Sequence, residues 1–176
     1  GRAADACVKT ENNAEPKMTK WLTLAVLIVV ADQVTKFAVV QYFAASPAVA
    51  VTPFFNLVLV YNPGAAFSFL SDAAGWQRGL FIALALGASA WIVYLLHKFP
   101  HQRLFALALS LVLAGAVGNV IDRILFGAVV DFLDFHAFGW HWPAFNVADS
   151  AITCGAVLLV WDAFRPHRAG TPEAQA

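Results

Sequence analysis

Residues 102–131 read QRLFALALSLVLAGAVGNVIDRILFGAVVD, and this stretch decides the fold of the chain. The part from 102 to 126 is predominantly apolar, and a helix needs about 20 such residues to cross the hydrocarbon core of a bilayer. Three polar side chains gather near its far end: Asn119, Asp122 and Arg123. The stretch therefore predicts a transmembrane helix with a polar end, followed by Val129 and Val130, which suit a strand leading into Asp131.

The composition of the whole chain indicates a membrane protein. Of its 176 residues, 60% are hydrophobic and 12% are charged, whereas soluble domains have about 25% charged residues. A soluble protein of this size could not cover so much apolar surface, so we expect an integral membrane protein with one compact domain. The formal net charge is zero, so no nucleic-acid partner is expected. Cys154 lies in an apolar run and is expected to be a packing residue.

Three further apolar segments are candidates for membrane-spanning helices: 20–43, 77–97 and 146–164. The first carries Asp32, Gln33 and Lys36 within it, and the second is nearly free of polar groups apart from Ser89. The last is short and opens with Asn146 and Asp149. We therefore predict a membrane α-helical fold with four transmembrane helices.

The two ends of the chain differ from this apolar part. Residues 1–17 are polar and mixed in charge and precede the only Met, so we expect an upstream extension that takes no part in the fold. Residues 169–176 are rich in Ala and are expected to form a disordered tail. The four-helix membrane domain is assigned to residues 18–168.

Lys and Arg residues predict the orientation of the four spans, because cytoplasmic loops carry an excess of them. They occur before the first span, between the second and third, and after the fourth: Lys17, Lys20, Lys98, Arg103, Arg165 and Arg168. None occurs between Phe43 and Arg78 or between Ile124 and Phe164. Both termini are therefore expected in the cytoplasm, and the connectors 44–76 and 127–145 outside it.

The outward connectors have the composition of short strands and not of ordinary loops. Residues 47–70 combine Val and aromatic side chains with Pro, Asn and Gly breaks, a pattern typical of strands and turns. The segment is too apolar to lie freely in water. We expect a small sheet on the outer membrane surface.

Polar side chains from three spans are expected in one layer near that surface. With a rise of about 1.5 Å per residue, Asp32 lies roughly 18 Å and Lys36 roughly 24 Å into the first span. Asn119 lies at the outer end of the third span, and Asn146 and Asp149 open the fourth. Asn146 suits the N-cap of the fourth helix, with Asp149 in its first turn.

Asp131 and Asp149 flank the second outward connector and are the candidates for acid–base chemistry. Asp134 competes with Asp131 for that role. Asp32 and Lys36, at i and i+4, fit either a structural ion pair or direct substrate contact. We expect Asn119, Asp122 and Arg123 of the third span to form a structural network.

Other hydrolytic mechanisms have less support. The sequence has no His-Glu-x-x-His motif and no Cys/His cluster, so no metal site is expected. Ser68 or Ser150 with Lys36 as base would make a Ser–Lys site, but neither serine has a setting that marks it out. Two carboxylates need no cofactor, and none is expected.

Five motifs, in order, give the chain a close resemblance to the lipoprotein signal peptidase family, the bacterial type II signal peptidases. The resemblance covers roughly residues 18–165, and the motifs are Asp32-Gln33-Val34-Thr35-Lys36, Asn62-Pro63-Gly64-Ala65-Ala66-Phe67, Gly118-Asn119-Val120-Ile121-Asp122-Arg123, Val129-Val130-Asp131-Phe132 and Phe145-Asn146-Val147-Ala148-Asp149-Ser150. Each motif alone is weak, and the ordered set is specific.

The resemblance implies an aspartic peptidase of the inner membrane with a small periplasmic β-cradle, its active site near the periplasmic face. Its partners would be membrane lipid and diacylglyceryl-modified prolipoproteins, which it would cut just before the lipidated cysteine. Asp131 and Asp149 match the catalytic pair, and Asp134 matches no family position. The remaining matches are active-site or supporting positions: Asp32, Lys36, Asn62, Asn119, Asp122, Arg123 and Asn146. Of these, Asn62 and Arg123 are candidates for holding the substrate backbone.

A small proton-coupled transporter or channel subunit is the alternative, because intramembrane charges also mark ion paths. Such a path requires polar groups across the whole membrane. The inner half of the predicted spans is nearly bare of them, which favours the peptidase.

Overall fold

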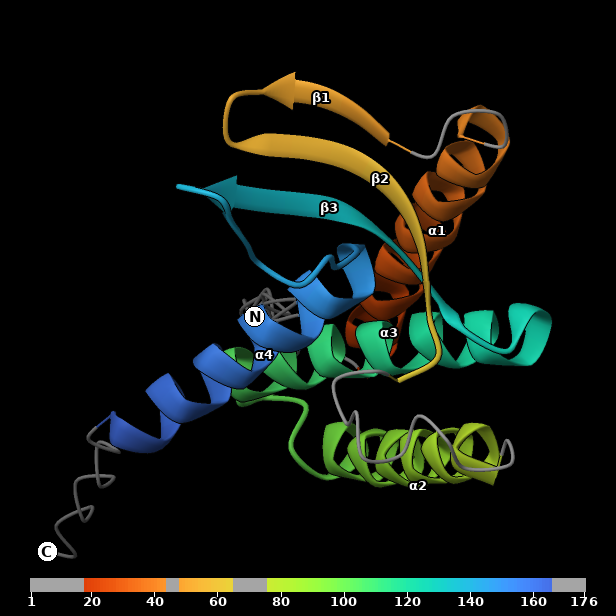
Figure 1. Ribbon diagram of the computed structural model, residues 1–176. Helices are drawn as coiled ribbons and strands as arrows, with labels where there is room; N and C mark the ends of the chain where they lie inside the picture. Colours follow the sequence, from red (N-terminus) through yellow and green to blue (C-terminus); the bar gives the residue numbers. More distant parts are fainter. Residues whose placement is uncertain (1–17, 44–47, 65–75, 166–176) are drawn as a thin grey trace, which may run out of the picture.

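The computed structural model describes residues 18–43, 48–64 and 76–165. The predicted extension at 1–17 and the predicted disordered tail at 169–176 lie outside these residues. The described part consists of four helices and one small sheet (Figure 1).

Each predicted span is a helix, with ends within two residues of the predicted ones: α1 (Met18–Tyr42), α2 (Trp76–Lys98), α3 (Arg103–Phe126) and α4 (Val147–Phe164). All four are long and apolar enough to cross a membrane. The prediction of four transmembrane helices is therefore confirmed.

The connectors supply four short strands: β1 (Ala48–Thr52), β2 (Phe55–Asn62), β3 (Val129–Ala137) and β4 (Trp140–His141). They form one antiparallel sheet in the order β1-β2-β3-β4. Phe138 and Gly139 both have positive φ angles, 52° and 79°, as the central residues of a two-residue type I′ hairpin turn do. The predicted sheet is therefore present, and Figure 1 shows it at one end of the helical bundle.

Helix α3 is the centre of the bundle and packs against the other three helices. Its contact with α4 depends on small residues. A Cβ atom on Gly115 would collide with the carbonyl oxygen of Ala148, and one on Gly155 of α4 would lie 2.7 Å from the carbonyl oxygen of Ala108. Glycine at these positions lets the two backbones approach closely, which is typical of helix contacts in membranes.

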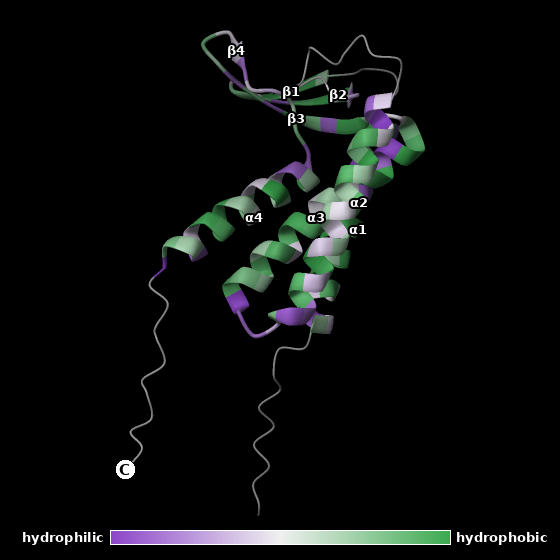
Figure 2. Ribbon diagram, turned by 90° about the horizontal axis from the view of Figure 1, so that it is seen from below, coloured by the Kyte–Doolittle hydropathy of each residue, from purple (hydrophilic) through white to green (hydrophobic). Residues whose placement is uncertain are grey.

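The outer faces of the helices are apolar, as Figure 2 shows by colour. Large side chains on these faces are more than half exposed, including Leu27, Leu84, Trp91 and Trp161. Such a surface is suited to contact with lipid. Cys154 is also exposed on α4, so the expectation that it packs inside was wrong, because an apolar run in a membrane helix serves the lipid-facing side as well as the core.

The start of α1 and the α2–α3 turn lie on the same side of the bundle. The indole N–H of Trp21 donates a hydrogen bond of 3.0 Å to the carbonyl oxygen of Pro100 in that turn. The sheet lies at the opposite end (Figure 2). The start of α1 and the α2–α3 turn, which carry Lys20, Lys98 and Arg103, therefore lie at the end of the bundle opposite the sheet.

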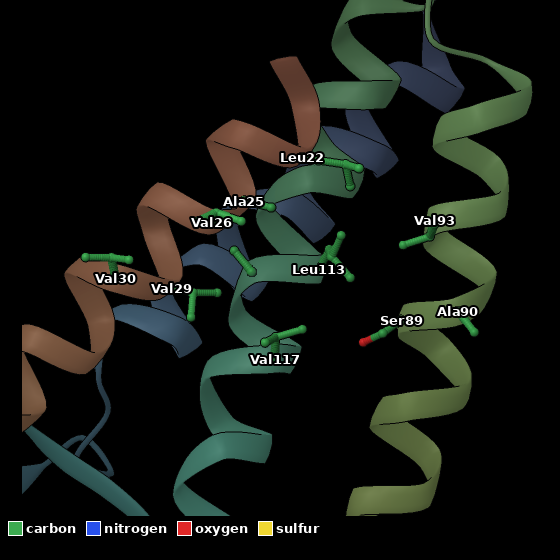
Figure 3. A pocket seen from close by; sticks show the side chains of 11 residues that line it. Leu22, Ala25, Val26, Val29, Val30, Ser89, Ala90, Val93, Leu113 and Val117 are labelled. Carbon is green, nitrogen blue, oxygen red and sulfur yellow. The ribbon is translucent and has the colours of Figure 1, made fainter. Parts of the chain in front are cut away.

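An apolar groove of about 650 Å³ runs between α1, α2 and α3 (Figure 3). Its walls include Leu22, Val29, Val93 and Leu113, and Ser89 is its polar member. The Ser89 hydroxyl has no hydrogen-bond partner among the described residues. The groove offers no titratable group, so the candidate chemistry is at the sheet end of the bundle.

Candidate active site

Asp131 lies on β3 and is 2% exposed. Its Oδ1 accepts a hydrogen bond of 2.8 Å from Asn146 Nδ2, and its Oδ2 accepts one of 3.0 Å from Asn62 Nδ2. Both carboxylate oxygens are therefore held by amide donors, one from the start of α4 and one from the end of β2.

The Asn62 amide is fixed by a turn that its own side chain makes. Its Oδ1 accepts a 2.9 Å hydrogen bond from the backbone N–H of Gly64, which leaves Nδ2 pointing at Asp131. Gly64 has φ +110°, and a Cβ there would lie 2.8 Å from Phe81. Only glycine fits this conformation and this space, so the Asn-Pro-Gly turn orients the amide that donates to Asp131.

Asp149 lies in the first turn of α4, where it forms a capping box with Asn146. The Asn146 Oδ1 accepts a 2.8 Å hydrogen bond from the Asp149 N–H, and Asp149 Oδ2 accepts one of 3.3 Å from the Asn146 N–H. The predicted N-cap is confirmed. Asp149 Oδ1 accepts a further bond of 2.8 Å from Asn119 Nδ2 on α3.

Asn146 joins the two candidate carboxylates. Its side chain is fully buried and donates to Asp131, to the carbonyl oxygen of Val130 at 3.2 Å and to Asn119 Oδ1 at 3.3 Å. Phe145, just before it, pairs with β3 through backbone hydrogen bonds to Leu133. These contacts hold the start of α4 beside β3 and so bring Asp149 near Asp131.

The environment favours a proton on Asp131. Burial is the largest cause that raises the pKa of Asp131 from 3.8 to about 6, and repulsion from Asp149 adds to it. The amide donors of Asn62 and Asn146 and the charge of Lys36 act in the opposite direction. Two carboxylates that share one site favour a single shared proton.

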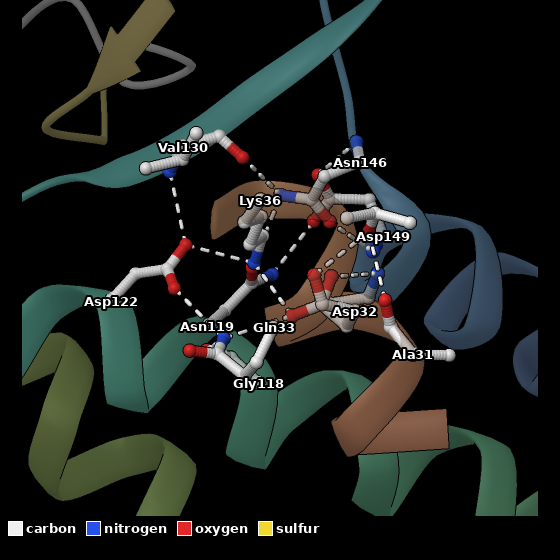
Figure 4. A network of polar contacts seen from close by, with 12 residues as sticks. Ala31, Asp32, Gln33, Lys36, Gly118, Asn119, Asp122, Val130, Asn146 and Asp149 are labelled. Carbon is white, nitrogen blue, oxygen red and sulfur yellow. Dashed lines mark hydrogen bonds and ion pairs between the residues drawn. The ribbon is translucent and has the colours of Figure 1, made fainter. Parts of the chain in front are cut away.

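A second group of charges lies beneath this pair, between α1 and α3 (Figure 4). Lys36 Nζ lies 2.8 Å from Asp32 Oδ2 and 2.8 Å from Asp122 Oδ2, and it donates to Asn119 Oδ1 at 3.2 Å. The exposed fractions are 3% for Lys36 and 0% for both carboxylates. Asp32 and Lys36 thus form a buried ion pair, which is the geometry expected of the structural alternative.

Gln33 belongs to the same network, although its position in the sequence predicts no role for it. Its Nε2 donates to Asp32 Oδ2 at 3.1 Å and to Asp122 Oδ1 at 2.9 Å, and it lies 3.2 Å from the carbonyl oxygen of Gly118. The sequence did carry one signal for this contact: Gln33 is an uncharged polar residue next to Asp32 inside a predicted span.

Arg123 lies beside the pair, at the outer end of α3. Its Nη1 donates to the carbonyl oxygen of Asn119 at 3.2 Å, and its guanidinium lies 5.2 Å from the ring centroid of Phe81. Its Nε is buried and has no hydrogen-bond partner among the described residues. The guanidinium interacts electrostatically with Asp149, Asp122 and Asp131.

Asp134 is separate from this site. It accepts a 2.8 Å hydrogen bond from Asn56 on β2 and pairs with His141 Nδ1 at 2.9 Å. Burial tends to raise the pKa of Asp134, but these two partners and the charge of His136 outweigh it, so that the pKa is lowered. Residues three apart on a strand point to opposite faces, which explains why only Asp131 faces α4.

The structure brings the predicted polar residues into one layer. Hydrogen bonds or ion pairs join all nine of them: Asp32, Lys36, Asn62, Asn119, Asp122, Arg123, Asp131, Asn146 and Asp149. Within residues 18–43, 48–64 and 76–165, no group of three His, Cys, Asp or Glu side chains is placed to hold a metal ion. The chemistry available here is that of paired carboxylates with amide donors.

Comparison with known proteins identifies the family. A family model described as signal peptidase (SPase) II matches residues 24–165. The lipoprotein signal peptidase of Burkholderia mallei (strain SAVP1) is 57% identical over 151 residues, which are 86% of this chain and 91% of that protein. The lipoprotein signal peptidase of Burkholderia vietnamiensis (strain G4 / LMG 22486) is 57% identical over 155 residues, with 88% and 93% covered.

The fold is also similar to solved structures. Two bacterial membrane enzyme structures, determined by the in meso method at 2.3 and 1.9 Å resolution, align with TM-scores of 0.72 and 0.71 and sequence identities of 35% and 34%. The alignments cover 82% and 85% of this chain and 87% and 95% of those chains. With four membrane-spanning helices, a small antiparallel sheet and this sequence similarity, the chain belongs to the signal peptidase II family.

Proposed function

We propose that the protein is an aspartic endopeptidase that removes the signal peptide from diacylglyceryl-modified prolipoproteins by cutting just before the lipidated cysteine. Its family makes it a protease of the bacterial membrane, and its relatives are named lipoprotein signal peptidases. The observation that carries the aspartic mechanism is the link between Asp131 and Asp149 through Asn146. These are the two catalytic residues of the proposal.

The surroundings of the two carboxylates suit them to different roles. Burial and the nearby charge of Asp149 favour the protonated form of Asp131. Asp149 accepts N–H donors from Asn119 and Asn146 and lies at the N-terminus of α4, where negative charge is favoured. We therefore assign Asp131 as the general acid and Asp149 as the general base.

The reaction then proceeds in two steps with water as the second reactant. Asp149 takes a proton from water, whose oxygen attacks the scissile carbonyl carbon, while Asp131 gives its proton to the carbonyl oxygen. In the second step one hydroxyl of the gem-diol returns a proton to Asp131, Asp149 gives its proton to the leaving nitrogen, and the C–N bond breaks. Both carboxyl groups end in their starting states.

Arg123 is a candidate for holding the substrate backbone. Its guanidinium lies next to the carboxylate pair, and its Nε has no partner among the described residues. A buried N–H without a partner is costly, and a substrate carbonyl oxygen would satisfy it. Asn62, the other candidate for this role, already donates to Asp131, which supports a role in orienting the acid.

We place the sheet and the carboxylate pair at the periplasmic face of the inner membrane, with both termini in the cytoplasm. The absence of Lys and Arg from residues 44–77 and 125–163 supports this orientation. The substrate's signal helix and acyl chains would then remain in the bilayer while its peptide bond meets the pair at the surface.

A proton-coupled transporter or channel subunit gains no support from the described residues. The charged network lies at the sheet end of α1 and α3, and the groove through the rest of these helices is lined by apolar side chains apart from Ser89. A conducting path needs polar groups through the whole thickness. The arrangement therefore favours catalysis at one surface.

Cleavage of a diacylglyceryl-modified prolipoprotein by the purified protein tests the proposal. The unchanged protein is expected to release the signal peptide. Asp131→Asn and Asp149→Asn should each lose cleavage while remaining folded in detergent, and Asp134→Asn is the matched control that keeps substantial activity. Cleavage at a near-normal rate by either of the first two variants would refute the assignment, as would loss of activity in chelator with recovery on adding zinc.

A further inference from the structure

The buried carboxylates of Asp32 and Asp122, beneath the active site, each bind a backbone N–H just before one of the two catalytic residues. Asp32 Oδ1 accepts a 2.8 Å hydrogen bond from the N–H of Ala148, which directly precedes Asp149. Asp122 Oδ2 accepts a 3.0 Å hydrogen bond from the N–H of Val130, which directly precedes Asp131. Each catalytic residue therefore follows a peptide N–H that a fully buried carboxylate binds.

Two side chains of α1 connect these carboxylates to each other. Lys36 Nζ lies 2.8 Å from both of them. Gln33 Nε2 also bridges them, at 3.1 Å from Asp32 and 2.9 Å from Asp122. The Lys36 contacts supply most of the electrostatic attraction. The Gln33 amide adds a second, uncharged bridge, which shares Asp32 Oδ2 with Lys36 but binds the other oxygen of Asp122, Oδ1.

We propose that Gln33 is a positioning residue, which ties Asp32 to Asp122 and thereby fixes the relative positions of Asp149 and Asp131. The path from Gln33 to each catalytic residue runs through one carboxylate and one peptide N–H. The rest of the connection is rigid, because Ala148 is in α4 and Val130 is paired in the sheet. This role rests on the proposed function, since it presumes that the two carboxylates act together.

The geometry that Gln33 maintains also controls the electrostatics of the pair. Asp131 is influenced by Asp149 on α4, Lys36 on α1 and Arg123 on α3, and by the amide donors of Asn62 and Asn146. If the bridge between Asp32 and Asp122 loosens, Asp149 and Asp131 are free to separate, and their mutual repulsion weakens. The protonated form of the pair is then lost at a lower pH.

The test compares Gln33→Met with Gln41→Met in the full chain. Both variants exchange an amide for a thioether of similar length on α1, but Gln41 is exposed near the end of the helix and outside the network. For each protein, kcat, KM and the pH profile are measured with a diacylglyceryl-modified prolipoprotein, and folding is checked by thermal unfolding in detergent. Gln33→Asn, with a shortened amide, replaces Gln33→Met if the latter does not fold.

For Gln33→Met we expect kcat to fall by about 10- to 100-fold, since small misplacements of reacting groups have effects of this size. KM should change little, and the alkaline limb of the pH profile should move to lower pH. Gln41→Met should match the unchanged protein. An unaltered kcat and pH profile, or a loss fully explained by less folded protein, would overturn the role of Gln33, whereas an inactive unchanged protein would instead overturn the proposed function.

Discussion

Replacement of Asp131 by Asn should change the stability of the protein in a pH-dependent way. An acid with a raised pKa in the folded state binds its proton more tightly when the protein is folded. Asp131 therefore stabilises the fold below its ordinary pKa of 3.8, and that contribution is lost as the pH rises through about 6. An asparagine carries no charge at any pH, so the variant should lack this dependence.

The size of the effect follows from the pKa and from the hydrogen bonds. A rise from 3.8 to about 6 corresponds to roughly 3 kcal/mol as an upper limit, because one pKa unit is about 1.4 kcal/mol. Partial hydration of the site reduces it to about 2 kcal/mol. The introduced asparagine would also offer one oxygen to two amide donors, Asn62 and Asn146, so one bond is lost at every pH at a cost of about 1–2 kcal/mol. The variant should be clearly less stable than the unchanged protein at pH 4, and the deficit should be smaller by about 2 kcal/mol at pH 8, where only the cost of the lost hydrogen bond remains.

The assay is thermal unfolding of both proteins in the same detergent from pH 4 to pH 8. With about 2–4 °C of Tm per kcal/mol for a chain of this size, the difference in Tm should change by roughly 4–8 °C across this range. Asp134→Asn is the control with the opposite sign, because the pKa of Asp134 is lowered and its stabilising contribution is lost as the pH falls. A difference in Tm between Asp131→Asn and the unchanged protein that stays constant from pH 4 to pH 8 would refute the reasoning.

Three further outcomes are expected. Lys36→Met should lower the free energy of unfolding by about 3–5 kcal/mol, because it leaves buried carboxylates without their cation. In thermal melts in detergent, the double variant Asp32→Leu/Lys36→Met should lose less stability than Lys36→Met alone. Additive losses would show that the two sites are not coupled. Gly118→Ala should destabilise the protein by about 1–3 kcal/mol, since the new Cβ would lie 2.6 Å from Asp32 Oδ2, and an unchanged Tm would contradict this close packing. Reporter fusions at Gly139 and His101 should read as periplasmic and cytoplasmic, and a cytoplasmic signal at Gly139 would invert the proposed topology.

The helices were predictable because their cause is local. Length and apolar composition alone identify a membrane-spanning segment, and the observed helices begin and end within two residues of the predicted bounds. The N-cap at Asn146 was predictable for the same reason, since capping depends on a side chain within three residues of its partner.

The convergence of polar residues in one layer was also predictable, because the helical rise fixes the depth of Asp32 and Lys36 in the first span. Their partners were not. The bonds from Asp32 to Ala148 and from Gln33 to Asp122 join residues 116 and 89 positions apart. Such contacts depend on how the helices pack, and no local pattern records them.

The choice between Asp131 and Asp134 shows the limit of the sequence most clearly. Without the family resemblance, their spacing left both open as partners for Asp149. The register of β3 decides between them: Asp131 is paired opposite Val60 with its side chain toward α4, and Asp134 is opposite Asn56, to which it is hydrogen-bonded. Strand register is set by neighbouring strands and by the packing of one face.

By itself, the sequence determined the membrane class, the four spans, the sheet and the layer in which the charges gather, since each follows from hydropathy, local periodicity or helical rise. Only the tertiary structure decided which carboxylate faces Asp149. It also decided that Lys36 and Gln33 each join Asp32 to Asp122, the two carboxylates that bind the N–H groups just before Asp149 and Asp131. The physical reason is that hydrogen bonds and ion pairs act over about 3 Å, so they specify a site only after packing has brought distant segments within that distance.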